Sequence, residues 1–241
     1  MYPFGAPTVR GEAHNASVVG PNILQIDVES GGLRATQTWL LSDLIPPGNR
    51  GCQYTQYDVS DPIDIISGSV VLGTVDMVSA LYKSDPFVAL SVAVTAGASD
   101  TTFTISSATV AFDAITNPDA YAVASLTVID NNGNGAALTG LYPGGKAYQT
   151  TYANGGGAAT WASLTGSFAA SANRTKTFAD AYPADNSVPI VDTLYNIQSQ
   201  YYFQLSAYDS ATGTSHFEIT PEPATLSLLA LGGLALLRRR K

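Results

Sequence analysis

A strict alternation of large apolar and small residues is the strongest constraint on the fold of this chain. In the segment 87–95 (FVALSVAVT), Val88, Leu90, Val92 and Val94 fall on one face and small residues occupy the other. Side chains of a β-strand alternate between the two faces of a sheet, whereas a helix repeats every 3.6 residues. The segment therefore predicts a strand with one face in a hydrophobic core.

The same period of two returns along the rest of the chain. The segment 121–129 alternates in this way, and 201–208 alternates Tyr201, Phe203 and Leu205 with mostly polar residues. Within 101–112 the phase shifts near Ser106 and Ser107, which predicts a β-bulge or a break in the strand. Further strands are predicted at 17–28, 33–40, 53–59, 68–81, 147–152, 159–169 and 214–219.

These segments predict an all-β fold, an antiparallel β-sandwich of the jelly-roll or immunoglobulin-like kind, because turns rich in Gly, Asn, Asp and Pro separate them. No clean boundary divides the strands, so residues 1–218 are expected to form a single β-sandwich domain, followed by a distinct tail, 219–241. The less regular stretch 171–200 is expected to wrap an edge of the sandwich.

The body of the chain is strongly acidic. Without the four cations at its C-terminal end, seven Lys and Arg face 19 Asp and Glu, a net charge of about −12. Such a surface repels nucleic acid, so we expect no nucleic-acid partner. The single cysteine, Cys52, cannot form an internal disulfide. A buried, inert thiol is the simplest interpretation, and pairing between molecules is the alternative.

The last 21 residues differ in kind from the body. They comprise Pro221, Glu222 and Pro223, an uncharged apolar run from Ala224 to Leu237, and the basic residues Arg238, Arg239, Arg240 and Lys241. We expect residues 224–237 to form a short hydrophobic helix in lipid. Its length of about 21 Å is shorter than a hydrocarbon core of about 30 Å. The basic end is expected on the cytoplasmic side, which puts the body outside the cytoplasm.

This order of elements resembles the PEP-CTERM sorting signal of exported bacterial proteins, which exosortase-type membrane enzymes process. The matching parts are Pro221-Glu222-Pro223, the helix 224–237 with its pair Gly232-Gly233, and the basic cluster 238–241. The resemblance implies export, a transient stage in the inner membrane and cleavage near the Pro-Glu-Pro segment. It also implies delivery to the cell envelope, the cell surface or the extracellular matrix. An unprocessed C-terminal membrane anchor is the alternative.

The beginning of the chain does not match an exported protein. Residues 1–10 (MYPFGAPTVR) contain two prolines and no apolar core of a secretion signal. Because export requires such a signal, we expect the true start to lie upstream of Met1. The alternative is that the tail is a relic on a chain that is not exported.

Motifs for catalysis are scarce, and we expect neither catalytic residues nor enzyme activity. His14 and His216 are far apart, and Ser69 lacks the flanking glycines of a G-x-S-x-G elbow. The sequence contains neither H-E-x-x-H nor C-x-x-C. The acidic residues that could meet as a glycosidase pair are Asp27, Glu29, Asp58, Asp61, Asp64 and Asp76. Exposed strand ends and turns are the simpler interpretation of these residues.

One loop matches the first half of a calcium-binding loop. In 130–135 (DNNGNG), Asp130, Asn132 and Asn134 place oxygens at alternating positions before a glycine. The twelfth position, which should be a bidentate acid, is Leu141. A hairpin turn that uses Asn and Gly for positive φ is the simpler interpretation. No cofactor is expected, with calcium at Asp130, Asn132 and Asn134 as the alternative.

Aromatic residues near loops suggest a second type of function, because their rings can stack on sugars. The candidates are Trp39, Tyr54, Tyr57, Tyr142, Tyr148, Tyr152 and Trp161, although packing within the sandwich is the simpler role. Two functions therefore stand. The first is a non-enzymatic surface or matrix protein with a structural or adhesive role. The second is an exported module that binds extracellular polysaccharide, or a glycan-active enzyme.

Overall fold

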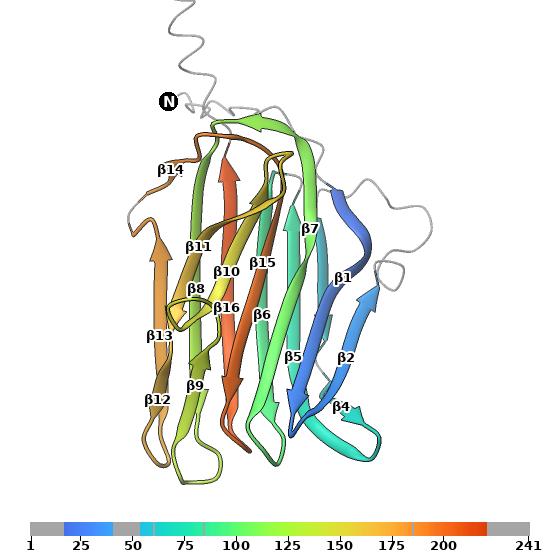
Figure 1. Cartoon of the computed structure of the whole chain (residues 1–241), viewed down its shortest axis with the longest axis vertical. Helices are drawn as coiled ribbons and strands as arrows, with labels where there is room; N and C mark the ends of the chain where they lie inside the picture. Colours follow the sequence, from blue (N-terminus) through green and yellow to red (C-terminus); the bar gives the residue numbers. More distant parts are fainter. Residues whose placement is uncertain (1–16, 41–53, 60, 84, 185, 221–241) are drawn as a thin grey trace, which may run out of the picture.

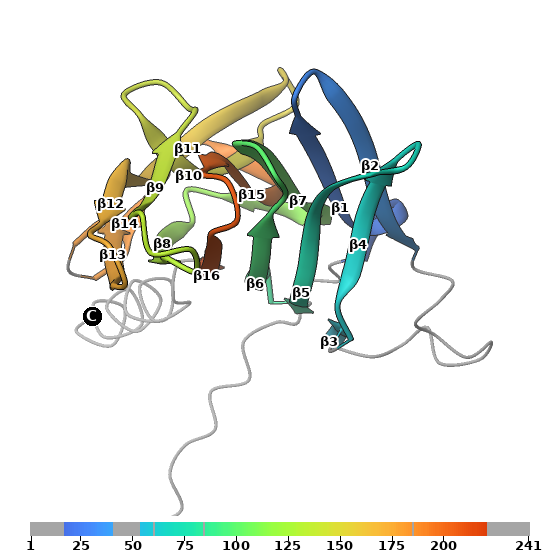
Figure 2. The same cartoon turned by 90° about the horizontal axis from the view of Figure 1, so that it is seen from below.

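The computed structural model describes residues 17–40, 54–59, 61–83, 85–184 and 186–220, and within these ranges the protein is all-β. Two antiparallel sheets lie face to face (Figures 1 and 2). Sheet A has the order β11 (Ala158–Gly166), β10 (Lys146–Ala153), β15 (Thr193–Leu205), β7 (Thr101–Thr116), β1 (Ser17–Ser30) and β2 (Leu33–Leu40). In addition, β9 (Ala136–Gly140) pairs with β15, and β12 (Phe168–Ala170) pairs with β9.

Sheet B has the order β13 (Thr175–Tyr182), β8 (Asp119–Ile129), β16 (Ser210–Thr220), β6 (Phe87–Ala96), β5 (Val70–Lys83) and β3 (Tyr54–Val59). The short strand β14 (Val188–Pro189) pairs with β8, and β4 (Ile63–Ser67) pairs with β5. The chain passes repeatedly from one sheet to the other, so that β16 lies between β8 and β6, and β15 lies between β7 and β10.

The predicted alternation places the correct residues in the core. Val88, Leu90, Val92 and Val94 on β6 are all buried between the sheets. The same holds for the apolar phases of β7, β8 and β15, which supply Phe103, Ile105, Leu126, Val128, Tyr201, Phe203 and Leu205. Burial of these faces supplies the main stabilising free energy of the fold.

Two glycines make room for large rings of the opposite sheet. Tyr201 on β15 points at Gly213 on β16, where a Cβ would lie 3.3 Å from the ring carbon Cζ. A Cβ on Gly73 of β5 would lie only 2.9 Å from Cζ of Phe103. These pairs show how the sheets interlock, since a close-packed core cannot hold an extra methyl group without strain.

The phase shift predicted near Ser106 and Ser107 is a β-bulge, and β7 continues through it. Ser107 and Ala108 are both buried, although they are neighbours. The pairing of β1 with β7 shifts between Val19 and Leu24, and the pairing of β15 with β7 shifts between Ile197 and Gln200.

Tyr82 of sheet B fills the gap that the bulge leaves in the backbone pairing of sheet A. Its hydroxyl accepts a hydrogen bond from the N–H of Ala108 at 3.0 Å and donates one to the carbonyl of Ile23. Burial raises the pKa of Tyr82 well above its ordinary value, and the bond from Ala108 only partly offsets this. One side chain therefore satisfies two buried backbone groups.

The prediction that residues 171–200 wrap an edge of the sandwich is wrong in part. This region contains β13, β14 and the first half of β15, all paired within the two sheets. Strand β13 is an edge strand with most of its residues exposed, so its sequence lacks the alternation of a half-buried strand. The predicted strand 201–208 also runs too far, because β15 ends at Leu205 and Tyr208 has a φ of +65° in the following turn.

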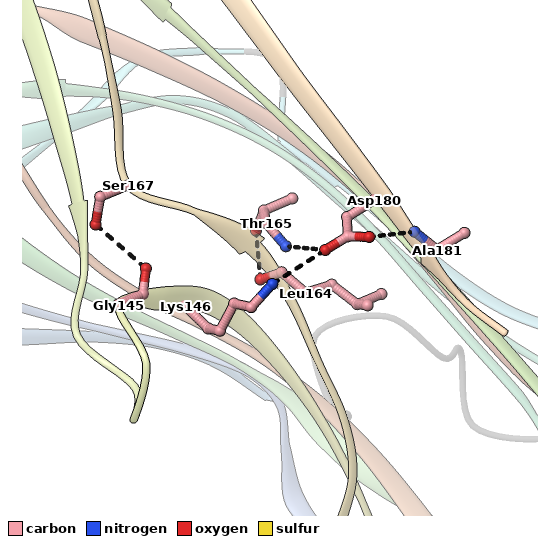
Figure 3. A network of polar contacts seen from close by, with 7 residues as sticks. All are labelled: Gly145, Lys146, Leu164, Thr165, Ser167, Asp180 and Ala181. Carbon is pink, nitrogen blue, oxygen red and sulfur yellow. Dashed lines mark hydrogen bonds and ion pairs between the residues drawn. The ribbon is translucent and has the colours of Figure 1, made fainter. Parts of the chain in front are cut away.

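A polar network closes the sandwich beside β13 (Figure 3). Asp180 on β13 accepts hydrogen bonds from Lys146 Nζ at 3.2 Å and from the backbone N–H of Thr165 at 3.3 Å. Its other oxygen accepts the N–H of Ala181 at 3.0 Å. Because Lys146 and Thr165 belong to sheet A, this carboxylate links the edges of the two sheets.

Candidate functional site

The structure defines where the C-terminal tail leaves the body. Strand β16 is paired with β8 up to its last residue, with Thr220 opposite Asp119, and with β6 up to Glu218, opposite Phe87. The N–H of Ile219 donates to the carbonyl of Pro86 at 2.9 Å. Residue 221 therefore follows directly from a paired strand of sheet B.

The predicted sorting residues lie outside the described residues. These are Pro221, Glu222, Pro223, Ala224, Leu237, Arg238, Arg239 and Arg240, and the predicted helix 224–237 lies outside as well. Within the described ranges, no helix has the length and apolar character needed to cross a bilayer.

A row of uncharged polar side chains crosses the outer face of sheet A, and we call it the polar row. The pairing registers place its members side by side on six neighbouring strands: Thr38, Gln25, Ser106, Gln200, Gln149 and Ser163. All six are half-buried. At about 4.8 Å between strands, the row is about 24 Å wide.

Hydrogen bonds and an aromatic pair order the polar row. Gln149 Nε2 donates to Ser163 Oγ at 3.1 Å, and Gln200 Nε2 donates to Ser106 Oγ at 2.5 Å. The hydroxyl of Tyr142 donates to Gln200 Oε1, and its ring lies edge-on to Tyr202 with 5.5 Å between the centroids. Burial, with Tyr202 and Tyr148 nearby, raises the pKa of Tyr142, so it remains a neutral donor.

The bulge makes a hollow beside the polar row. It has a volume of about 330 Å³, and its polar lining includes Asn22, Gln25, Ser106 and Gln198. Gln198 Nε2 donates to the carbonyl of Ser107 at 2.9 Å, which holds one wall in place. The hollow thus presents amide and hydroxyl groups without a charged side chain in its lining.

The Asp130 loop, the predicted calcium loop, connects β8 to β9. One oxygen of Asp130 accepts the N–H groups of Asn132 at 3.3 Å and Gly133 at 2.9 Å, and the other accepts the N–H of Asn173. Partial desolvation raises the pKa of Asp130, but the N–H donors, including Gly135, outweigh it and lower that pKa overall.

A hydrogen bond links the other two predicted calcium ligands, Asn132 and Asn134. Asn132 accepts the N–H of Asn134 at 3.0 Å and donates to the carbonyl of Ala207 at 2.9 Å. The described residues hold no cluster of three His, Cys, Asp or Glu side chains that could bind a metal ion. Calcium binding by Asp130, Asn132 and Asn134 stays a prediction.

His216 belongs to a group on the outer face of sheet B, close to the end of β16. Its Nε2 lies 3.0 Å from Oε2 of Glu218, and its ring packs edge-on against Phe87 with 4.5 Å between the centroids. Lys83 Nζ lies 4.4 Å from the Phe87 ring centroid. The hydrogen bond from His216 lowers the pKa of Glu218. Partial desolvation raises this pKa by less, and the charges of His216 and Lys83 lower it further.

The carboxylates considered for glycoside hydrolysis are divided between the two sheets. Asp27 and Glu29 lie on β1, whereas Asp64 and Asp76 lie on β4 and β5. Asp27 accepts from Thr36 at 2.6 Å, Asp64 from Thr74 at 2.8 Å and Asp76 from Thr95 at 2.6 Å. Asp61 is exposed, and the side chain of Asp58 lies outside the described ones, as do His14 and Cys52. The structure therefore divides the described acids between the two sheets.

The predicted aromatic residues fall into several groups. Trp39 and Tyr148 are buried, and the hydroxyl of Tyr148 donates to Ser199 at 2.9 Å; burial raises its pKa to about 12. Trp161 stacks on Phe217 across the sandwich with 5.5 Å between the centroids. Tyr152 packs against the core, Tyr142 lies by the polar row, and the side chains of Tyr54 and Tyr57 lie outside the described ones.

Sequence reasoning missed most of the polar row. Gln200, Gln149 and Gln25 of the row were not predicted as site residues, and neither was Tyr202 beside it, because each is one polar residue in the solvent phase of a strand. The run of Gln198, Gln200, Tyr202 and Gln204 on β15 is the one signal that could have found this face, since these residues alternate with buried ones.

The all-β body leads directly into a C-terminal tail. The tail, and not the fold of the body, identifies the class of exported and sorted proteins. Residues 220–241 match the family model described as the PEP-CTERM protein-sorting motif. The chain therefore carries a PEP-CTERM sorting motif, as the sequence predicted. The motif indicates exosortase-dependent sorting of an exported protein to the cell envelope or surface.

Several solved structures resemble the body distantly. No curated protein matches the chain. The active domain of tailspike protein 4 from bacteriophage CBA120 is 10% identical, with a TM-score of 0.27 over 69% of this chain and 19% of that one. A xylan-binding domain from Paenibacillus barcinonensis is 7% identical, with a TM-score of 0.25 over 69% and 86%. A cyclase from Fischerella sp. TAU is 11% identical, with a TM-score of 0.23 over 81% and 89%. These values carry no argument about function.

Proposed function

We propose that this protein is an exported surface or matrix protein that an exosortase-type enzyme cleaves near Pro221-Glu222-Pro223, and that its β-sandwich has a structural or adhesive role without catalysis. The observation that carries the proposal is the sorting motif at residues 220–241, which begins where strand β16 ends. Because the motif follows β16 directly, this strand connects the body to the membrane-bound tail until the chain is cleaved.

The arrangement of the described acids supports a role without catalysis. Asp27, Asp64 and Asp76 each accept a hydrogen bond from a threonine hydroxyl, on strands of two different sheets. Glycoside hydrolysis needs two carboxyl groups that face each other across a bound sugar. These side chains instead act as local acceptors that order the outer faces of the sandwich.

Replacing the Pro-Glu-Pro segment tests the sorting proposal. The variant Pro221→Ala, Glu222→Ala and Pro223→Ala should keep the full-length mass and remain with the inner membrane of the native host. A matched variant in the body, Thr214→Ala, should be sorted like the natural chain, because Thr214 lies on the outer face of β16 within the sheet. Normal release of the triple alanine variant would overturn the proposal.

We further propose a second candidate function, binding of a neutral polysaccharide at the polar row. The supporting observation is the combination of uncharged amide and hydroxyl groups with the rings of Tyr142 and Tyr202. Sugar hydroxyls pair with such amides, and aromatic rings stack on the apolar faces of sugars. A neutral chain also avoids the repulsion that this acidic body exerts on anionic polymers.

Sedimentation with insoluble neutral glycans such as cellulose or xylan tests this second candidate. Tyr202→Ala and Gln200→Ala should each lower the bound fraction several-fold, whereas Thr214→Ala on the outer face of sheet B should leave it unchanged. Equal binding by all three variants would exclude the polar row as the binding site. No binding by the natural chain would exclude these glycans as ligands.

We also infer that the body is a jelly roll rather than an immunoglobulin-like sandwich. The strands β6, β16, β8 and β13 form one sheet, and β7, β15, β10 and β11 form the other. The last two strands in the chain are thus inserted between earlier ones in both sheets. A double Greek-key arrangement of this kind is typical of jelly rolls.

A further inference from the structure

We propose that the end of the sandwich from which the tail leaves lies against the lipid surface during the membrane-bound stage, with Val191 and Tyr195 in the membrane interface. The inference rests on the proposed sorting function, because it requires residues 224–237 to sit in the bilayer. It goes further by assigning the orientation of the body and a second, direct contact with lipid.

Pairing registers identify the part of the body that lies next to the tail. Thr220, the last residue of β16, is paired with Asp119 of β8, and Asp119 is in turn paired with Pro189 of β14. Val191 comes two residues after Pro189, in the turn from β14 to β15. Figure 1 shows β14 and the end of β16 at the same end of the molecule.

The tail allows this end little distance from the bilayer. Only residues 221–223 separate Thr220 from the apolar run that begins at Ala224. The four residue steps from Thr220 to Ala224 span at most about 14 Å, even when fully extended. If the apolar run is in lipid, the end of β16 is within this distance of the interface, and the residues beside it are close as well.

Val191 has the high exposure expected of a residue that contacts a membrane. Its side chain is 86% exposed, the highest value among the large hydrophobic residues of the described part of the chain. Hydrogen bonds hold its turn on both sides, since Ile190 N–H donates to the carbonyl of Pro118 and Asn117 N–H donates to that of Asp192, each at 2.8 Å. An apolar side chain exposed to water contributes no free energy of burial, whereas contact with lipid would bury the side chain of Val191.

Tyr195 supplies a second residue suited to the interface. It lies four residues after Val191, near the start of β15, and is 44% exposed. Tyrosine is enriched where membranes meet water, because its ring is apolar and its hydroxyl stays hydrated. A valine and a tyrosine would bind a membrane weakly by themselves, but the tail keeps them close to it.

Charges at this end favour a neutral lipid surface. Asp85, Asp119, Asp192 and Glu218 lie on the segments around the end of β16 and outnumber Lys83, so anionic lipid headgroups would repel this end. A zwitterionic surface is therefore the better partner. Replacing phosphatidylcholine with phosphatidylglycerol in a vesicle should weaken the contact, and a stronger contact would contradict this part of the inference.

A matched control exists at the opposite end of the sandwich. Val70 is 46% exposed at the start of β5, whereas Lys83 ends that strand and pairs with Phe87 beside the end of β16. At about 3.3 Å per residue, the strand places Val70 about 40 Å from this end. Both positions are exposed valines, Val191 within a turn and Val70 next to one.

The test is fluorescence quenching in phosphatidylcholine vesicles that contain nitroxide-labelled lipid. The full chain, with Cys52→Ser, carries a fluorophore on Val191→Cys, Tyr195→Cys or Val70→Cys and is reconstituted through its own tail. Labels at positions 191 and 195 should be quenched several-fold more than the label at position 70. Each variant should also unfold at the temperature of the natural chain.

Each outcome decides between the two proposals. Flotation with the vesicles but equal quenching at positions 191 and 70 would overturn this inference and leave the sorting proposal intact. Failure of the full chain to float with the vesicles would overturn both, because the tail would then not insert into lipid.

Discussion

The hydroxyl of Tyr82 holds together the irregular part of sheet A. It pairs with the N–H of Ala108, beside the bulge in β7, and with the carbonyl of Ile23, where the register of β1 with both of its neighbours shifts. Tyr82→Phe keeps the ring but leaves both buried groups without this partner. We expect a loss of about 1–3 kcal/mol in the free energy of unfolding, measured by urea denaturation.

A matched variant distinguishes this effect from a general effect of removing a hydroxyl. Tyr195→Phe removes a hydroxyl from a side chain that is 44% exposed, and it should change stability by less than about 0.5 kcal/mol. Equal effects of the two substitutions would show that Tyr82 does not have the role assigned to it.

Asp130 should make stability depend on pH. Its pKa is lowered in the folded state, so its carboxylate contributes stability above the pKa of the unfolded chain, about 3.9, and this contribution is lost as pH falls. Asp130→Asn should therefore be less stable than the natural chain at pH 7, and the difference should narrow below about pH 4. Urea denaturation at several pH values measures it. A difference that is the same at pH 7 and pH 3 would contradict this account.

The calcium prediction can be tested on the same loop. If Asp130, Asn132 and Asn134 bind the ion, millimolar calcium should raise the melting temperature of the natural chain but not that of Asp130→Asn. An unchanged melting temperature in calcium and in a chelator would exclude the site.

At the level of strands, Asp180 contributes more to the joining of the sheets than its ion pair suggests. Its carboxylate accepts the backbone N–H groups of Thr165 and Ala181 as well as the ammonium group of Lys146. Both side chains of the ion pair are 33% exposed, so solvent weakens it. The backbone of Thr165 is less accessible, since that residue is buried.

Asp180→Ala should therefore destabilise the protein more than Lys146→Ala. We expect about 1–2 kcal/mol for Asp180→Ala, which leaves backbone donors unpaired, and less than about 1 kcal/mol for Lys146→Ala. Urea denaturation of the two variants makes the comparison. A larger effect of Lys146→Ala would show that the ion pair, and not the backbone contact, joins the edges.

Strands with one buried face were predictable from the sequence, and so were the edge strands β2, β3 and β11, whereas the edge strand β13 was not. Strand β6 alternates because one of its faces lies in the core, and the bulge in β7 was visible as a change of phase at Ser106 and Ser107. Strand β13 has most of its side chains in solvent, and β9 has only five residues, so neither has a clear period. Alternation reports burial, and where burial is weak the signal disappears.

For the molecule as a whole, the sorting motif was predictable because it is local in sequence. The polar row was not, because Thr38, Gln25, Ser106, Gln200, Gln149 and Ser163 come together only through the pairing of six strands. No local pattern specifies such a register between distant strands. The end of the body that we assign to the membrane also became visible only through the pairing of β14, β8 and β16.

The central claim is that the tail directs this β-sandwich out of the cell and is then removed. The most direct test is the intact mass of the protein recovered from each fraction of its native host. The account predicts an external protein whose C-terminus lies near Pro221, without residues 224–241. A full-length chain that remains in the inner membrane, or that is recovered from the cytoplasm, would contradict it.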